Sequence, residues 1–298
     1  MKKKLHSGTR THVPVMPKEV ISCLNIIPNG IYIDGTIGIG GHSSLIISLL
    51  SKKGHLIGID RDEEALKMCK KRFSSQKNSL SLFKESYHQF NSILDRLGIN
   101  QVNGIFLDLG LSSLQLDSKN RGFSFNINAN LDMRFDQSQK TKASHIINQF
   151  SQKDLANIIY QYGEERRSRI IAKNIVKKRP LKTVFDLVEA IRKSTPPNKR
   201  NKSIARVFQA LRITVNNELE KLDIFLSSFY KRLCLGGRIV IISFHSLEDR
   251  KVKQCFNSFK KENKLKILFK KPLYPSLEEL EKNMRSKSAK LRAAEKIN

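Results

Sequence analysis

The sequence has no long apolar stretch. Its run Leu45–Leu50 has the length found in a core helix, whereas a helix that spans a bilayer needs about 20 apolar residues. The basic residues Lys2–Lys4 are followed by polar residues, where a signal peptide would have its apolar segment. We therefore expect neither a membrane span nor a secretory leader.

Cysteine is also scarce. The four cysteines Cys23, Cys69, Cys234 and Cys255 lie far apart, and no two of them form a C-x-x-C pair. This spacing argues against a disulfide framework and against a zinc module. We expect a reduced, cytoplasmic protein without a metal site.

Acidic residues are few compared with basic ones. The 298 residues include 27 Asp and Glu against 55 Lys and Arg, which gives a formal net charge of +28. Hydrophobic residues still make up 39%, enough to bury a sizeable core, so the chain does not have the composition of a disordered protein. A surface of this charge concentrates phosphate-bearing ligands, which indicates a polyanionic partner.

Short apolar runs alternate with helical patterns in the first half of the chain. The runs 31–34, 55–60, 79–83 and 104–108 are expected to be strands, and three of them end in Asp34, Asp60 and Asp108. Strands that alternate with helices indicate a parallel sheet covered on both faces. Ligands bind such sheets at the carboxyl ends of the strands, where these three acids would lie.

The second half of the chain interrupts this α/β pattern. Residues 120–136 are polar and expected to form a loop, and residues 143–226 are mostly helical in pattern. A buried strand is then expected at 238–244. We therefore predict one α/β domain formed by residues 1–135 and 226–298, with a helical insertion at 136–225 and a basic C-terminal tail.

A glycine-rich turn, Asp34–Ser43, follows the first expected strand. It is not a P-loop, because Gly41 stands where that motif has its lysine, and Ser43 breaks a clean G-x-G-x-x-G pattern. The turn by itself is equally typical of a tight strand–helix connection. Asp60, about twenty residues later at a strand end, stands where an acid holds a ribose diol, although it could instead cap the next helix. Together the two segments favour a nucleoside-type cofactor.

Two further segments can carry chemistry. Asp108 begins the segment Asp108–Asp117 and would lie beside the cofactor, unless it only caps a helix. His245 follows the returning strand, where it could act as an acid or base, or be a packed, hydrogen-bonded histidine. A nicotinamide-dependent oxidoreductase and a non-catalytic RNA-binding factor are the alternatives from other functional classes.

Together these segments resemble the bacterial small-subunit rRNA cytosine-N4 methyltransferases of the MraW/RsmH type. The matching blocks run in order along almost the whole chain: 12–15, 19–20, 32–43, 59–62, 108–117, 121–125, 131–134, 162–166, 208–216, 218–219, 236–250 and 286–296. The resemblance implies a Rossmann-like class I methyltransferase sheet with an inserted all-helical domain. It implies S-adenosylmethionine (SAM) as the methyl donor and the N4 amine of a decoding-site cytidine in 16S rRNA as the acceptor.

The resemblance also implies the site residues. Matching positions place Gly40, Gly41, His42, Asp60, Tyr87, Asp108 and Gln115 at the cofactor. Asp108 or the adjacent carbonyl groups would accept hydrogen bonds from N4 or hold the methionine amino group. As the second catalytic candidate we take His245, with Phe244 stacking on the base.

The expected partner is 16S rRNA within the small ribosomal subunit. Candidate RNA contacts are Lys199, Arg200, Lys202 and Arg206, together with Arg285, Lys287, Lys290 and Arg292 of the tail. The alternative for such charge runs is a solvated surface. The oligomeric state stays open, a homodimer being one option.

Overall fold

The computed structural model describes residues 14–76 and 79–298. The basic start of the chain and the motif residues His12 and Val13 lie outside them. The strands are β1 (Ile31–Asp34), β2 (His55–Asp60), β3 (Leu80–Lys84), β4 (Val102–Asp108), β5 (Leu233–Ser243), β6 (Leu265–Ile267) and β7 (Lys290–Lys296). The helices are α1 (Pro17–Leu24), α2 (Gly41–Leu49), α3 (Glu63–Arg72), α4 (Phe90–Arg96), α5 (Ser113–Asp117), α6 (Ala143–Gln149), α7 (Gln152–Gly163), α8 (Ser168–Lys177), α9 (Val184–Arg192), α10 (Arg200–Asn216), α11 (Glu218–Arg232), α12 (Ser246–Lys261) and α13 (Leu277–Lys282). Short 3-10 helices are η2 (Tyr87–Gln89), η3 (Pro197–Lys199) and η4 (Met284–Ser288).

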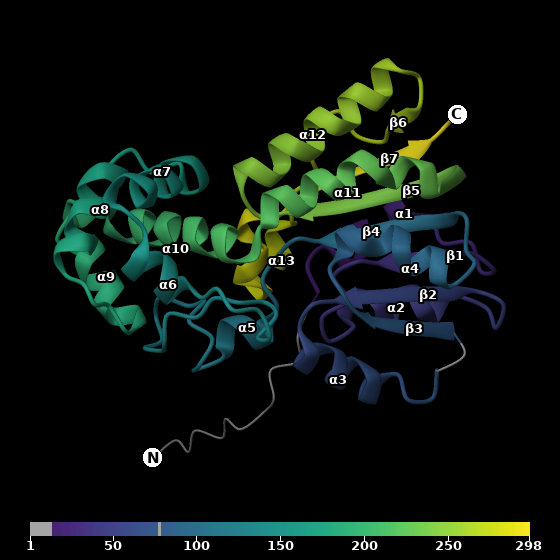
Figure 1. Ribbon diagram of the computed structural model, residues 1–298. Coiled ribbons are helices and arrows are strands. Elements are labelled where there is room, and N and C mark those ends of the chain that lie inside the picture. Colours follow the sequence, from purple (N-terminus) through teal and green to yellow (C-terminus); the bar gives the residue numbers. More distant parts are fainter. Residues whose placement is uncertain (1–13, 77–78) are drawn as a thin grey trace, which may run out of the picture.

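The strands form one seven-stranded sheet in the order β3-β2-β1-β4-β5-β7-β6 (Figure 1). Strands β1 to β5 pair in parallel, and β7 runs antiparallel to both β5 and β6. The expected parallel sheet is therefore confirmed, and Asp34, Asp60 and Asp108 end β1, β2 and β4. Their side chains start from the edge of the sheet at which ligands bind in this class of fold.

Successive residues of each central strand point to opposite faces of the sheet, and each face has its own apolar core. On one face, Ile33 and Ile105 pack with residues of α4, α11 and α12. On the other, Tyr32 and Phe106 pack with residues of α1, α2 and α3. Burial on both faces explains why these strands are continuous apolar runs in the sequence.

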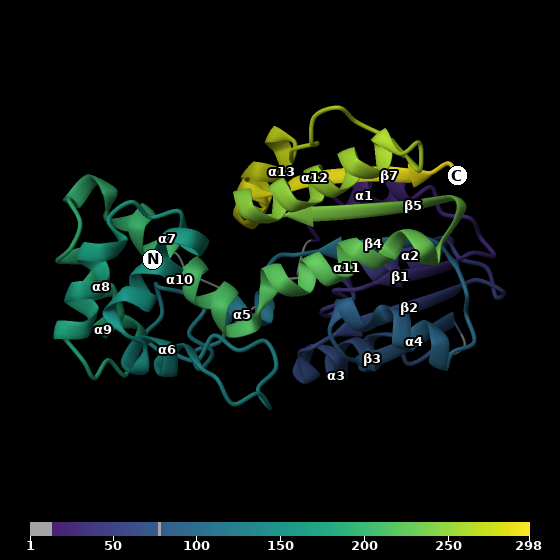
Figure 2. The same cartoon turned by 45° about the horizontal axis from the view of Figure 1, so that its top comes forward.

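The helical insertion has a third core, which draws residues from Phe123 to Val215. Helices α6 to α10 lie beside the sheet, and α10 leads into α11, which lies along the sheet (Figure 2). Leu222 and Phe225 of α11 belong to the core of the sheet domain. The division at 136–225 stays a proposal, and this packing favours an earlier end to the insertion, at the α10–α11 joint.

The end of the chain differs from the expected basic tail. Residues 290–296 form β7, which lies between β5 and β6 inside the sheet. Leu291 and Ala293 are buried, whereas Lys290 and Arg292 form ion pairs with Asp249. The sequence did not predict this strand, because its buried apolar residues alternate with charged residues. In the described part of the chain, no helix is long and apolar enough to cross a membrane.

Candidate active site

The glycine-rich turn after β1 is fastened to the ends of two neighbouring strands. The Gly38 amide donates a 2.8 Å hydrogen bond to Asp60 Oδ2 at the end of β2. Asp108 N, at the end of β4, donates to Thr36 Oγ1 at 2.7 Å. The turn and both acids therefore form one edge of a pocket.

The buried carboxyl of Asp34 is hydrogen-bonded to both ends of the turn. It accepts a 2.6 Å hydrogen bond from Ser43 Oγ on α2 and a longer one from the Thr36 amide. Burial raises the pKa of Asp34 to about 6, although these hydrogen bonds lower it. Asp34 is thus a structural acid at the base of the turn, where a buried carboxylate is stable only when it is well bonded.

The sequence left open whether the acid at the end of β2 lines a pocket or caps the next helix, and Asp60 and Asp62 take one role each. Asp62 caps α3 by accepting from the Glu64 amide, whereas Asp60 lines the pocket. Burial raises the pKa of Asp60 to about 6. A carboxylate at this strand end can hold two vicinal hydroxyl groups.

His42 and Asp108 face each other across the pocket wall. The His42 Nδ1 atom lies 3.9 Å from Asp108 Oδ2, and Nε2 lies 2.7 Å from the Val15 carbonyl oxygen. Burial lowers the pKa of His42 and raises that of Asp108 to about 7. The imidazole is therefore mostly neutral at pH 7, and the Asp108 carboxyl is ready to exchange a proton near that pH.

Gln115 and Tyr87 complete the pocket, while Gly40 lies behind it. The Gln115 side chain donates to Asp62 and accepts from the Ser112 amide, so both of its polar ends are used. Tyr87 contacts Phe225 edge to face. Among the described residues, the pocket wall includes Gly41 and His42 but not Gly40, whose φ of 83° and close approach to the Phe73 ring require glycine. The assignment of these residues to the cofactor stays a prediction.

The lining also includes charged residues to which the sequence-based prediction assigned no role, among them Arg61, Glu218 and Lys221. Arg61 directly follows Asp60 and donates to the Asn216 carbonyl, as does Lys221. Burial lowers the pKa of Lys221 to about 8. The position of Arg61 at the pocket could have been predicted from its neighbour Asp60. Residues 216–221 reach the pocket only because α10 and α11 join there.

A second cavity opens on the other side of Asp108. Its apolar wall is aromatic and comes from the sheet domain and the insertion together: Phe123, Phe125, Phe208 and Phe244, with Leu111, Leu116, Met133 and Met284. Lys282 and Arg285 also line it, as does His245. Asp108 and Leu111 line both cavities, so Asp108 lies where the contents of the two would meet.

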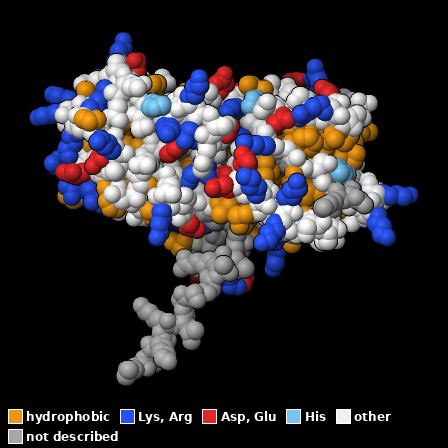
Figure 3. Space-filling view, turned by 60° about the horizontal axis from the view of Figure 1, so that its bottom comes forward, with side chains coloured by type: hydrophobic (Ala, Val, Ile, Leu, Met, Phe, Trp, Pro, Cys, Tyr) orange, Lys and Arg blue, Asp and Glu red, His pale blue; other side chains and the backbone are white. Residues whose placement is uncertain are grey.

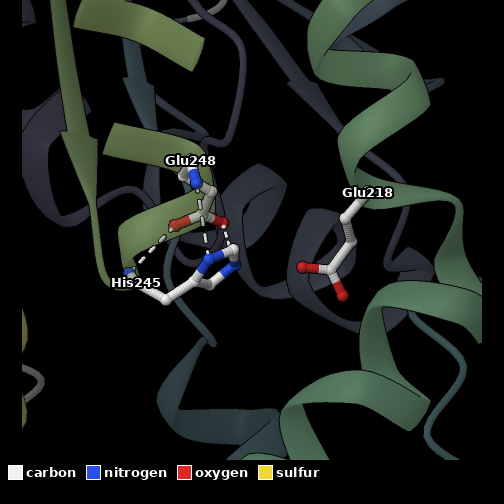
Figure 4. A group of neighbouring side chains, drawn as sticks. All are labelled: Glu218, His245 and Glu248. Atoms are coloured by element: carbon white, nitrogen blue, oxygen red, sulfur yellow. Dashed lines mark hydrogen bonds and ion pairs between the residues drawn. The ribbon is translucent and has the colours of Figure 1, made fainter. Parts of the chain in front are cut away.

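His245 caps α12 and belongs to a buried acidic group with Glu218 and Glu248 (Figure 4). Each residue offers an atom that could bind a metal ion, and these atoms lie within 4.8 Å of one another. Arg212 Nη2, however, lies 2.9 Å from Glu218 Oε2 and 4.0 Å from Glu248 Oε1. The guanidinium therefore already supplies the positive charge that this group needs.

A Rossmann-like sheet with this strand order, an antiparallel β7 and a pocket lined by the glycine-rich turn and the strand-end acids Asp60 and Asp108 defines a class I SAM-dependent methyltransferase. The sequence matches the MraW methylase family over residues 9–297, and the chain belongs to that family. It is 46% identical over 292 residues to the ribosomal RNA small subunit methyltransferase H of Kosmotoga olearia, covering 96% of this chain and 98% of that protein. It is 48% identical over 290 residues to the protein of that name from Thermosipho africanus, and the match covers 96% of this chain and 98% of that protein. Family membership sets the oxidoreductase alternative aside.

The pocket residues fit SAM as the methyl donor. The donor carries a ribose diol, an aromatic base and two cationic groups, the methionine ammonium and the sulfonium. The lining offers Asp60 for the diol and the Tyr87 ring for the base. Asp108, Glu218 and Glu248 add acidic side chains to the lining, although Glu218 and Glu248 also face Arg212.

Proposed function

We propose that this protein transfers the methyl group of SAM to the exocyclic N4 amine of a decoding-site cytidine in 16S rRNA of the small ribosomal subunit. The observation that carries the proposal is the position of Asp108 in the walls of both cavities. The first cavity suits the donor and the second, aromatic cavity suits a nucleobase. The names of the relatives support ribosomal RNA as the substrate.

The chain's part in the reaction is to position and activate a weak nucleophile. The sulfonium of SAM supplies an electrophilic methyl group, and transfer needs the reacting atoms in line at about 3–3.5 Å. The N4 lone pair of cytosine is delocalised into the ring. An Asp108 carboxylate that accepts a hydrogen bond from N4 pulls the amine toward tetrahedral geometry and raises its nucleophilicity. The same carboxylate can take the proton that N4 loses.

The target base must leave its stack to reach Asp108. N4 is engaged in pairing within a duplex, so enzymes that modify a base act on unpaired or extruded nucleotides. The aromatic wall of the second cavity offers stacking surfaces for such a base, Phe244 among them. We keep His245 as the second catalytic candidate, because its ring lies in the same wall.

Basic side chains supply the phosphate contacts. Lys and Arg side chains outnumber Asp and Glu on the face shown in Figure 3, over the helical insertion on the left as well as over the sheet domain. Lys199 and Lys202 are exposed, whereas Arg206 pairs with Glu165 and Arg285 with Asp117. We favour Lys199 and Lys202, two exposed lysines of the helical insertion, as RNA contacts. A cytoplasmic location follows from the proposed substrate.

The test is methyl transfer from labelled SAM to small ribosomal subunits that lack the modification. Nuclease digestion and nucleoside mass spectrometry then locate the label. We expect it on N4 of one cytidine. Label on another nucleoside would keep the methyltransferase and overturn the substrate, and no label with SAM binding intact would favour a non-catalytic RNA-binding role.

A further inference from the structure

Four polar side chains fill the wall between the two cavities. Glu218 and Glu248 line the cofactor pocket, and Arg212 and His245 line the aromatic cavity. They come from α10, α11 and α12 and its cap, and their side chains are only 4–12% exposed. We call these four residues the partition.

Arg212 brings a guanidinium to the partition. Its Nε donates to Glu218 Oε1 at 3.0 Å, and its Nη2 lies 2.9 Å from Glu218 Oε2, so the two planar groups face each other as a fork. Nη2 also lies 4.0 Å from Glu248 Oε1. Without this guanidinium, two buried carboxylates would lie close together with little compensation.

Glu248 links Arg212 to two residues of the aromatic cavity, Phe244 and His245. Its Oε2 accepts a 2.9 Å hydrogen bond from the Phe244 amide, and its Oε1 lies 3.1 Å from His245 Nε2. The Phe244 ring in turn packs on Gly110, where an added Cβ would lie 2.7 Å from the ring and 3.1 Å from Asp108 Oδ1. A continuous series of contacts thus joins Arg212 to Asp108.

The partition also spans the joint between the insertion and the sheet domain. Arg212 lies near the end of α10 and Glu218 begins α11, with Asn217 between these helices in the left-handed conformation. Glu164 of the insertion adds a second link, because it accepts from Ser246 and Arg250 of α12. The insertion is therefore tied to the same helix that carries Glu248.

We propose that Arg212 is a positioning residue for methyl transfer, one that sets the geometry of Phe244, His245 and Asp108 through Glu248. The inference rests on the proposed function, since it takes the aromatic cavity to hold the acceptor base. Displacing a reacting group by about 1 Å can slow a reaction 100-fold, so a shifted wall should affect transfer more than binding.

The experiment compares Arg212→Gln with a matched control, Arg238→Gln. Arg238 lies in the middle of β5, and its Nε and Nη2 are both 2.9 Å from Glu295 Oε2, so its loss also removes a positive charge and an ion pair with a glutamate. Single-turnover methylation of small subunits, the KM for subunits, the Kd for SAM and the thermal midpoint are measured for both variants.

Arg212→Gln should lower the single-turnover rate at least tenfold while the KM for subunits and the Kd for SAM change less than threefold. Arg238→Gln should keep its rate within twofold of the wild type. Equal rates in the two variants would overturn the proposal, as would a loss confined to KM or Kd.

A double variant covers the case in which Arg212→Gln does not fold. Arg212→Met with Glu218→Gln removes both charges of the fork, and such paired replacements are often tolerated. It should fold, keep its Kd for SAM within threefold of the wild type and still transfer at least tenfold more slowly. A wild-type rate, or a loss confined to the Kd, would overturn the proposal. If the wild type methylates a different nucleoside, the proposed function fails, but the comparison of variants can still be made on that nucleoside.

Discussion

Asp108 combines two properties that oppose each other. It is held by the Gly110 amide and placed near a mostly neutral His42, yet no cation neutralises it in the described structure at hydrogen-bond distance. Burial is the main reason that the pKa of Asp108 is raised to about 7. A carboxyl of this kind is costly to ionise and well suited to accept a proton.

Replacing Asp108 with Asn should lower the methylation rate about 100-fold or more, since a positioned base contributes roughly 10²–10⁴-fold. In the wild type, kcat/KM should fall as the pH drops below about 7, because protonation of Asp108 removes the acceptor. The variant should lose this acidic limb. A rate that is unchanged with saturating SAM and subunits would remove the carboxylate from the chemistry.

The same substitution should stabilise the protein without ligand. The pKa of Asp108 is higher in the folded state, so folding favours its protonated form, and stability falls as the pH rises from about 4 to about 7. Above pH 7 the buried carboxyl of Asp108 is ionised, and this lowers the free energy of unfolding by on the order of 2–4 kcal/mol, at 1.36 kcal/mol per pKa unit. The thermal midpoint of Asp108→Asn should therefore be higher than that of the wild type at pH 8 and equal to it at pH 4. Equal midpoints of the two proteins at both pH values would contradict this expectation.

At the scale of elements, the parallel strands were predictable because a strand buried on both faces must be apolar. Strand β7 was not, because Lys290, Arg292 and Glu295 find partners in Asp249 and Arg238 that lie far away in sequence. Four residues of the pocket lining were predictable from the sequence, namely Gly41 and His42 of the turn and the strand-end acids Asp60 and Asp108. Arg212 and Glu218 were part of the resemblance but received no role, since only the fold brings them to Glu248.

The joint between α10 and α11 allows a simple test of backbone strain. Asn217 is exposed and has a φ of 50°, a conformation that costs most residues about 1–2 kcal/mol. Asn217→Ala should lower the free energy of unfolding by about 1 kcal/mol, and Asn217→Gly should change it little. Urea unfolding measures both, and equal stability of the two variants would show that the joint is not strained.

The whole molecule, a sheet domain with a helical insertion, has a formal net charge of +28. If Lys199 and Lys202 contact phosphates, changing both to Gln should weaken binding to small subunits. The slope of log K against log salt should become shallower by about 1–2, since each phosphate contact contributes about 0.7–0.9. Lys52 and Lys53, exposed on the α2–β2 loop, are the matched control pair. The same slope in both double variants would exclude the 199–202 contact.

The position of β7 has a consequence for how the protein is made. This strand is the last of the sheet in sequence order, yet it lies between β5 and β6 rather than at the margin. During translation the insertion, whose core spans Phe123 to Val215, can assemble first, while the sheet must wait for its final segment. Until then the backbone edge of β5 that pairs with β7 has no partner strand, so a nascent chain stalled before residue 290 should be held as a client of chaperones rather than act as an enzyme.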